Sequence, residues 1–270
     1  MRLSPLIAVA LVSVLATLGV VAGVHYFRGT SSQTPAVTAR AVQQISQSTL
    51  AAPLAGAAPN FPALYTAVRP SVVEIDISGQ GGRRRSQQIQ GQGSGVVLDV
   101  QGHILTNEHV VNGAQTITVT FADGATASAT VAGTDPDDDL AIVTTNATQS
   151  ELHPVTLGDS AGLVVGDLVF AVGNPFGLSG SLSTGVISGL DRSLDAADGQ
   201  SQQQGLLQTD AAVNEGSSGG GLFDARGALI GITSALENPD ATTFAGVGYA
   251  VPIDTARQIM KQVLGGGGTP

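Results

Sequence analysis

The chain has 270 residues, a formal net charge of −10, 36 Gly and no Cys. The lack of Cys excludes a disulfide, a thiolate zinc site and a cysteine nucleophile. Its four His include no His-Glu-x-x-His stretch, which argues against a zinc hydrolase, and the sequence indicates neither a metal nor a cofactor. Residues 61–270 carry a net charge of −13, so nucleic acid is not an expected partner.

The first segment, residues 1–28, contains an uncharged run at residues 6–24. As a helix this run is about 28 Å long, close to the thickness of a hydrocarbon core. It is longer than the core of most signal peptides, which favours a retained transmembrane signal anchor over a cleaved signal peptide. A retained anchor predicts a single-pass protein at the cell membrane with its body outside the cytoplasm. A cleaved signal peptide predicts a secreted protein.

Residues 29–60 are rich in Ser, Gln, Ala and Pro and show no hydrophobic period, which is typical of a flexible linker. Residues 265–270 form a Gly-rich tail. The body of the protein is therefore expected at residues 61–264.

The body begins with a predicted short helix at residues 61–68, which ends before Pro70. A closing amphipathic helix is predicted at residues 254–264, with Asp254 as its expected N-cap. Between them lie twelve short β-branched runs separated by turn residues, which predict an all-β sandwich or a pair of barrels. The runs are 71–77, 95–99, 103–106, 116–121, 127–133, 140–144, 168–172, 185–189, 205–209, 222–223, 228–234 and 246–251.

A glycine-rich run at residues 216–221 contains two serines, Ser217 and Ser218. Such runs are usually plain loops, but glycines also allow the tight turn that exposes a nucleophilic Ser together with backbone N–H groups. A nucleophilic Ser needs a base, a group that orients the base, and donors for the oxyanion. The other members of such a site therefore have to be found elsewhere in the chain.

His109 is the candidate base, because it follows a predicted strand, whereas His103 and His153 fall in turns and are expected to be exposed. Asp139 is the candidate orienting group, because it abuts an apolar strand that can carry its carboxylate inward. Its neighbours Asp137 and Asp138 are expected to be solvated. The chain order of His, Asp and Ser matches the chymotrypsin type and neither the α/β-hydrolase nor the subtilisin order.

In these candidate residues and in the stretches around them, residues 61–264 resemble the protease domain of the HtrA (Deg) family of trypsin-like serine proteases. The resemblance implies a chymotrypsin-like double six-stranded β-barrel, with barrels at about 71–160 and 165–252 and the site in the cleft between them. Family members usually carry a PDZ domain next, but only six residues follow Leu264, so we expect a protease domain without one or a truncated chain. The matching stretches are 93–97, 104–111, 135–143, 171–177, 184–188, 208–214, 216–220 and 248–252.

The resemblance aligns Ser218 with the nucleophile and assigns the oxyanion donors to the backbone N–H groups of Gly216 and Ser218. Three positions depart from the family pattern: Glu215, Ser217 and Gly221 stand where Pro, Asn, and Pro or Ala are common. Glu215 puts a negative charge beside a site that must hold an oxyanion.

The residue six before Ser218 is Ala212, so a preference for Lys or Arg at P1, the residue before the scissile bond, is not expected. Val213 and Leu236 match pocket-lining positions of the family and favour a small apolar P1 residue. We also expect the strand of Gly231, Ile232 and Thr233 to pair with an extended substrate. That pairing requires an unfolded or misfolded polypeptide as substrate.

The sequence thus predicts a membrane-tethered, extracytoplasmic serine endopeptidase. The first alternative is a weakly active or inactive protease fold that serves as a binding or chaperone module, which Glu215 favours. Further alternatives are an esterase on the same site and a purely structural β domain. Because HtrA proteins often form trimers through the start of the protease domain, Phe61 and Tyr65 are candidate trimer contacts, although aromatic residues there are more often core residues.

Overall fold

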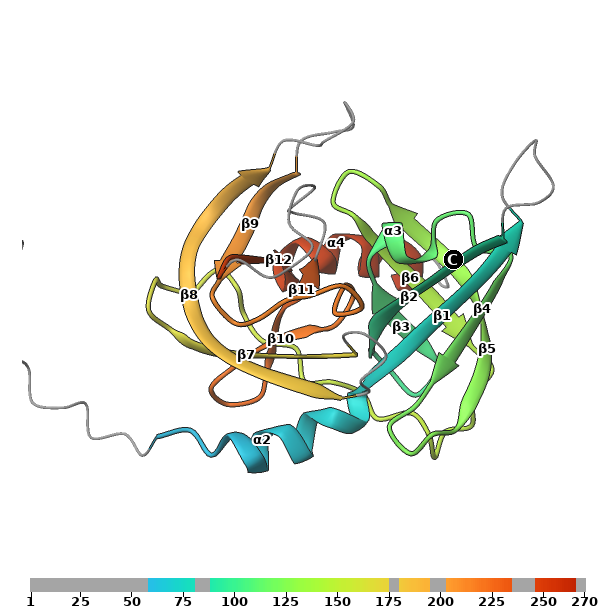
Figure 1. Ribbon diagram of the computed structural model, residues 1–270, viewed down its shortest axis with the longest axis horizontal. Helices are drawn as coiled ribbons and strands as arrows, with labels where there is room; N and C mark the ends of the chain where they lie inside the picture. Colours follow the sequence, from blue (N-terminus) through green and yellow to red (C-terminus); the bar gives the residue numbers. More distant parts are fainter. Residues whose placement is uncertain (1–57, 81–87, 175–179, 195–202, 235–245, 266–270) are drawn as a thin grey trace, which may run out of the picture. The chain divides into compact units, whose positions relative to one another are not determined.

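The computed structural model describes residues 58–80, 88–174, 180–194, 203–234 and 246–265 (Figure 1). The expected anchor at residues 6–24, the linker up to residue 57, Leu236 and the tail from residue 266 lie outside the described residues. Among the helices of the described ranges, none is long and apolar enough to cross a membrane.

Six antiparallel strands close the first barrel in the order β1-β2-β3-β6-β5-β4. The alternating apolar residues of β1, Val73, Ile75 and Ile77, are buried inside it, as expected for a strand with one face in a core. The strands are β1 (Val72–Gln80), β2 (Gln88–Val97), β3 (His103–Thr106), β4 (Thr116–Thr120), β5 (Thr126–Asp135) and β6 (Leu140–Thr145).

Six further antiparallel strands close a second barrel in the order β10-β11-β12-β9-β8-β7 (Figure 1). They are β7 (Leu168–Gly173), β8 (Ser181–Leu194), β9 (Gln203–Thr209), β10 (Gly221–Asp224), β11 (Leu229–Ser234) and β12 (Gly248–Pro252). The predicted all-β class and double six-stranded barrel are confirmed. The predicted strand at residues 185–189 is shorter than β8. The Gly, Ser and Asp residues of β8 are poor strand formers, and pairing with β7 and β9 holds them extended.

One apolar core joins the two barrels. Leu105, Leu140 and Ile142 of the first barrel share a buried cluster with Phe170 and Phe223 of the second, whose rings stack at a centroid distance of 5.2 Å. Because this core is buried and close-packed, it fixes the first barrel against the second and positions the loops that meet between them.

The predicted first helix is confirmed as α2 (Phe61–Val68), which a 3₁₀ turn, η1 (Arg69–Ser71), connects to β1. Its aromatic residues contact the second barrel: Phe61 meets Phe170 edge to face at 5.9 Å, and the Tyr65 hydroxyl donates to the Gly180 carbonyl at 2.5 Å. Both side chains are thus engaged within the chain, and a trimer stays a prediction.

The closing helix is α4 (Ile253–Leu264), and it contacts β6 of the first barrel and β11 of the second. The expected N-cap at Asp254 is wrong, because Pro252 occupies the cap position and Asp254 lies in the first turn. The Asp254 carboxylate instead accepts from the backbone N–H groups of Ser160 and Ala161, each at 3.0 Å, and from the Ser160 hydroxyl at 2.7 Å. It therefore fastens the connection between the barrels to α4.

Replacing Asp254 with asparagine is expected to lower the free energy of unfolding by about 1–2 kcal/mol at pH 7. The Ser160 hydroxyl bond is the main cause that holds the pKa of Asp254 below its ordinary value. A lowered pKa stabilises the fold above the unfolded-state pKa of about 3.9, and this stability is lost as the pH falls through the folded-state pKa. Urea unfolding between pH 3 and 7 should therefore show the wild-type advantage shrinking below about pH 4.

Ser160→Ala is the matched control for Asp254, and it should weaken this pH dependence by removing its main cause. A difference between wild type and the Asp254 variant that stays constant across the whole pH range would contradict the assignment.

Candidate active site

His109 and Asp139 are brought together by the pairing of β3 with β6. His109 lies on α3 (Glu108–Val111), a single helical turn after β3 that the sequence did not predict, and Asp139 directly precedes β6. Thr106 of β3 pairs with Ala141 of β6, so the two ends lie side by side. This register explains how two side chains thirty positions apart meet.

The imidazole of His109 and the carboxylate of Asp139 form a close hydrogen-bonded pair. His109 Nδ1 lies 2.9 Å from Oδ2 and 3.0 Å from Oδ1, and the His109 backbone N–H donates to Oδ1 at 3.0 Å. Asp139 is only 4% exposed. A buried carboxylate at Nδ1 keeps the proton on that nitrogen and leaves Nε2 as the acceptor.

Two residues that the sequence analysis missed support Asp139. Asn107 donates its side-chain N–H to the Asp139 carbonyl at 2.9 Å, and this bond helps to hold Asp139 at a φ of 51°. The Ser234 hydroxyl of β11 lies 3.5 Å from Asp139 Oδ2, so the second barrel also reaches this carboxylate. Asn107 stands two residues before His109 and is visible in the sequence, but Ser234 becomes relevant only when the barrels meet.

The neighbouring acids differ from the expectation in one respect. Asp137 is exposed as expected, but Asp138 is half-buried. Burial, and then the nearby charges of Asp135 and Asp137, raise the pKa of Asp138 above its ordinary value. The contacts described above join His109 to Asp139.

Ser218 follows a tight turn that begins at Asn214. The Ser217 backbone N–H donates to the Asn214 carbonyl at 2.8 Å, and Gly216, in the third position of the turn, has a φ of 86° that favours glycine. Ser218 is 5% exposed. The turn places Ser218 at the wall of a cavity rather than on an open loop.

His109 and Ser218 line the same cavity, which has a volume of about 290 Å³ and is called the Ser218 cavity below. It is lined by Ile77, Gly91, Gln92, His109, Val110, Glu215, Gly216 and Ser218. The structure thus brings together the predicted base, its orienting carboxylate, the predicted nucleophile and the predicted donor Gly216. A hydroxyl beside an imidazole that a carboxylate orients can perform acyl transfer.

The comparison with known families agrees with this geometry. A trypsin-like peptidase domain matches residues 93–232, about half of the chain, and that range contains His109, Asp139 and Ser218. The chain belongs to the trypsin-like peptidase family.

Relatives of this trypsin-like peptidase confirm the resemblance to HtrA (Deg) proteases. It is 49% identical to Protease Do-like 1, chloroplastic, of Arabidopsis thaliana over 65% of the chain. It is 40% identical to a probable periplasmic serine endoprotease DegP-like of Brucella suis over 64% of the chain. The chain spans 40% and 33% of the lengths of these two relatives.

A solved structure of an HtrA-type protease, AlgW with a tripeptide, matches with a TM-score of 0.67 and 34% identity. The match covers 76% of this chain and 64% of that structure's chain.

Ser94 of β2 links the first barrel of this trypsin-like peptidase to the turn around Ser218. Its hydroxyl donates to the Gly216 carbonyl at 2.8 Å and accepts from the Asn174 backbone N–H at 2.9 Å. Its backbone N–H donates to the Ser218 carbonyl at 2.7 Å. Ser94 thereby fixes the turn against the barrel that carries His109.

Gly219 is tightly enclosed directly after Ser218. It has a φ of 84°, and a Cβ there would lie 2.0 Å from the Ser94 carbonyl oxygen and 2.3 Å from Thr106 Oγ1. These two atoms are themselves hydrogen-bonded at 2.7 Å. The position therefore has neither the space nor the backbone conformation for a side chain.

Replacing Gly219 with alanine is expected to lower the free energy of unfolding by about 2–5 kcal/mol, from backbone strain and overpacking together. Gly124 is the matched control, because its φ is 88° but nothing lies within 4 Å of the added Cβ. Gly124→Ala should therefore cost only about 1 kcal/mol. Equal losses for the two variants in urea unfolding would show that the enclosure of Gly219 does not matter.

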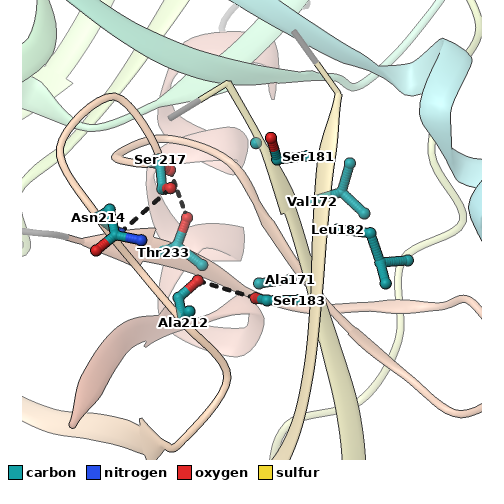
Figure 2. A pocket seen from close by; sticks show the side chains of 10 residues that line it. Ala171, Val172, Ser181, Leu182, Ser183, Ala212, Asn214, Ser217 and Thr233 are labelled. Atoms are coloured by element: carbon teal, nitrogen blue, oxygen red, sulfur yellow. Dashed lines mark hydrogen bonds between the residues drawn. The ribbon is translucent and has the colours of Figure 1, made fainter. Parts of the chain in front are cut away.

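A second cavity of about 170 Å³ is lined by Asn214 and Ser217 of the turn and by residues of β7, β8 and β11 (Figure 2). Figure 2 shows Ser217 bonded to Thr233 and Asn214: the Thr233 hydroxyl donates to the Ser217 carbonyl at 2.6 Å, and the Asn214 backbone N–H donates to the Ser217 hydroxyl at 3.4 Å. All of the residues that line this cavity are uncharged. The Thr233 bond attaches the turn to β11.

The predicted pairing of Gly231, Ile232 and Thr233 with substrate is wrong, because both edges of this strand are occupied. Gly231 and Ile232 pair with β10 on one side and with β12 on the other. Thr233 exchanges backbone hydrogen bonds of 2.9 Å with Gly219 and Gly220 and pairs with β12. An interior strand offers no backbone groups to a further strand, so an edge can begin only after Thr233.

The remaining predicted residues have different surroundings. Val213 is 6% exposed, and its side chain lies under Gly248, where an added Cβ would be 3.0 Å from Val213 Cγ2. Its role in P1 selection stays a prediction, as does that of Leu236. His153 is exposed as expected, but His103 is not fully exposed, because its Nδ1 lies 2.6 Å from an Asp99 carboxylate oxygen.

Proposed function

We propose that this chain is a serine endopeptidase that hydrolyses polypeptides through an acyl-enzyme at Ser218. The observation that carries the proposal is the buried Asp139 carboxylate bound to His109 Nδ1 at 2.9 Å, with Ser218 lining the cavity that His109 also lines. Membership of the trypsin-like peptidase family and the HtrA-type relatives support the same reaction.

In the proposed mechanism the Ser218 hydroxyl attacks the scissile carbonyl carbon while His109 Nε2 takes its proton. The backbone N–H groups of Gly216 and Ser218 stabilise the oxyanion of the tetrahedral intermediate. His109 then gives its proton to the leaving amine, the C–N bond breaks, and an acyl-enzyme remains. Water, deprotonated by His109, attacks the ester, and collapse of the second intermediate restores the Ser218 hydroxyl.

We propose unfolded or misfolded polypeptides as the substrate class, with a small apolar residue at P1. Ala212 provides no carboxylate for a basic P1 side chain, and Val213 is apolar. Because the strand up to Thr233 is fully paired, the substrate backbone is expected to pair from Ser234 onward. Such pairing needs an extended segment of substrate, which a folded protein rarely presents.

We also propose that the peptidase acts outside the cytoplasm, tethered through residues 6–24. The support is the uncharged run itself and the description of relatives as periplasmic or chloroplastic. Membrane fractionation of cells that express the full chain tests the tether. Recovery of the full-length chain in the soluble fraction alone would contradict it.

The test of the reaction is incubation of the full chain with unfolded casein and with a natively folded protein of similar size, beside Ser218→Ala. We expect cleavage of casein only, and only by the wild type. Mass spectrometry of the products should place Val, Ala or Ile before the new termini. Predominant cleavage after Lys or Arg would contradict the proposed P1 pocket.

A second candidate function is a binding module without turnover, which the exposed Glu215 carboxylate beside Gly216 favours. A negative charge at that position opposes the developing oxyanion. Retention of casein by wild type and Ser218→Ala alike, without cleavage by either, would support this module over the peptidase.

A further inference from the structure

The Ser218 cavity is lined both by the turn that carries Ser218 and by the first barrel. In the reaction proposed above, the acyl part of the substrate lies against the second barrel, which carries the oxyanion donors, Val213 and Ser234. From the turn the cavity extends to the first barrel, where Gly91 and Gln92 of β2 and Ile77 of β1 line it. The first residues after the scissile bond are therefore expected to enter this part of the cavity.

Glu215 places a negative charge at this cavity. Its side chain is exposed and lines the cavity next to Gly216 and Ser218. Among the lining residues there is no Lys or Arg, and His109 is the one side chain that becomes positively charged during the reaction. In the part of the chain that the structure describes, no ion pair neutralises the Glu215 carboxylate.

Gln92, the remaining polar side chain of the wall, strengthens this negative character. Its amide donates to Glu74 Oε1 at 2.6 Å and to Asp76 Oδ1 at 3.3 Å, so its donors are turned toward two carboxylates of β1. The amide nitrogen of Gln92 is thereby engaged by carboxylates. Of the carboxylates named here, Glu215 is the one that lines the cavity.

We infer that Glu215 is a specificity residue that selects Lys or Arg in the first two positions after the scissile bond. This inference rests on the proposed function. It gives Glu215, which stands where Pro is common in the HtrA family, a role in substrate choice. A long cationic side chain can lay its stem along Ile77 and Val110 while its charge meets the carboxylate. A Glu in the same substrate positions is repelled.

The test uses the full chain and quenched fluorescent peptides that share Val at P1 and carry Lys, Gln or Glu in the two following positions. For wild type, kcat/KM should be about three- to fivefold higher for Lys than for Gln, as expected for an exposed pair, and lowest for Glu. Added salt should reduce the ratio. In Glu215→Gln the ratio should fall close to one, and in Glu215→Lys the order should reverse.

Asp123→Asn is the matched control, because it removes one negative charge from an exposed hairpin between β4 and β5. It should keep the wild-type ratio. An unchanged ratio in Glu215→Gln, or an equal fall in Asp123→Asn, would overturn the inference while cleavage itself upholds the peptidase. Cleavage of none of the peptides and of no casein would instead overturn the proposed function, and the inference with it.

Discussion

Replacing Ser218 with alanine is expected to lower kcat for peptide hydrolysis by about 10⁶-fold. The variant loses the oxygen that forms the acyl-enzyme, while the turn, its bonds to Ser94 and the neighbouring Gly219 are backbone features that alanine keeps. The fold and the peptide-binding surface should therefore persist. Stopped and continuous hydrolysis assays with a peptide that has Val at P1 measure the loss of kcat. Thermal unfolding checks that the variant keeps the fold.

Ser217→Ala is the matched control for this variant, because it removes a hydroxyl one position away. Among the described residues, the Ser217 hydroxyl accepts a long bond of 3.4 Å from the Asn214 backbone N–H, so its loss should slow the reaction far less. If Ser217→Ala abolished hydrolysis and Ser218→Ala left it intact, the assignment of the nucleophile would be wrong.

Asp139→Asn is expected to reduce kcat by about 10⁴-fold. The carboxylate accepts from both the ring Nδ1 and the backbone N–H of His109, each at about 3.0 Å or less. An amide that keeps its oxygen on the backbone N–H turns its NH₂ group toward the ring, which then carries its proton on Nε2 instead. His109 in that tautomer cannot take the proton of Ser218.

The exposed Asp137, two residues earlier in the same turn, supplies the control, because Asp137→Asn makes the same chemical change at an exposed position. This variant should keep nearly wild-type kcat. Because the Asp139 variant lacks an oriented base, its residual rate should rise with pH as hydroxide replaces that base. A loss of less than tenfold in Asp139→Asn would mean that the carboxylate does not orient the imidazole.

The all-β class could be predicted from the sequence because twelve β-branched runs are separated by clear turn residues, whereas the double barrel followed from the resemblance to HtrA proteases. His109, Asp139 and Ser218 could be proposed as a triad because each stands next to such a run or turn. Strand ends were less predictable: β8 continues through Gly189 and Asp191, whose own preferences argue against a strand. Its extent depends on pairing with two neighbours that are distant in sequence.

Other features of the site depend on how the barrels meet, which no local pattern encodes. Ser94 and Ser234 become part of the site only when β2 and β11 face the turn and the Asp139 carboxylate. The sequence predicts a strand that includes residues 231–233, but a local pattern does not distinguish an interior strand from an edge. The position of Asp254 before an amphipathic segment predicts a cap, whereas its donors, Ser160 and Ala161, lie far away in the chain.

The most direct test of Ser218 as the nucleophile is covalent labelling of the full chain with a fluorophosphonate probe, followed by mass spectrometry of the modified peptide. We expect a single adduct on Ser218, absent in Ser218→Ala, strongly slowed in Asp139→Asn and retained in Ser217→Ala. An unlabelled wild type, or an adduct that persists when residue 218 is alanine, would contradict the claim that His109 and Asp139 activate this serine.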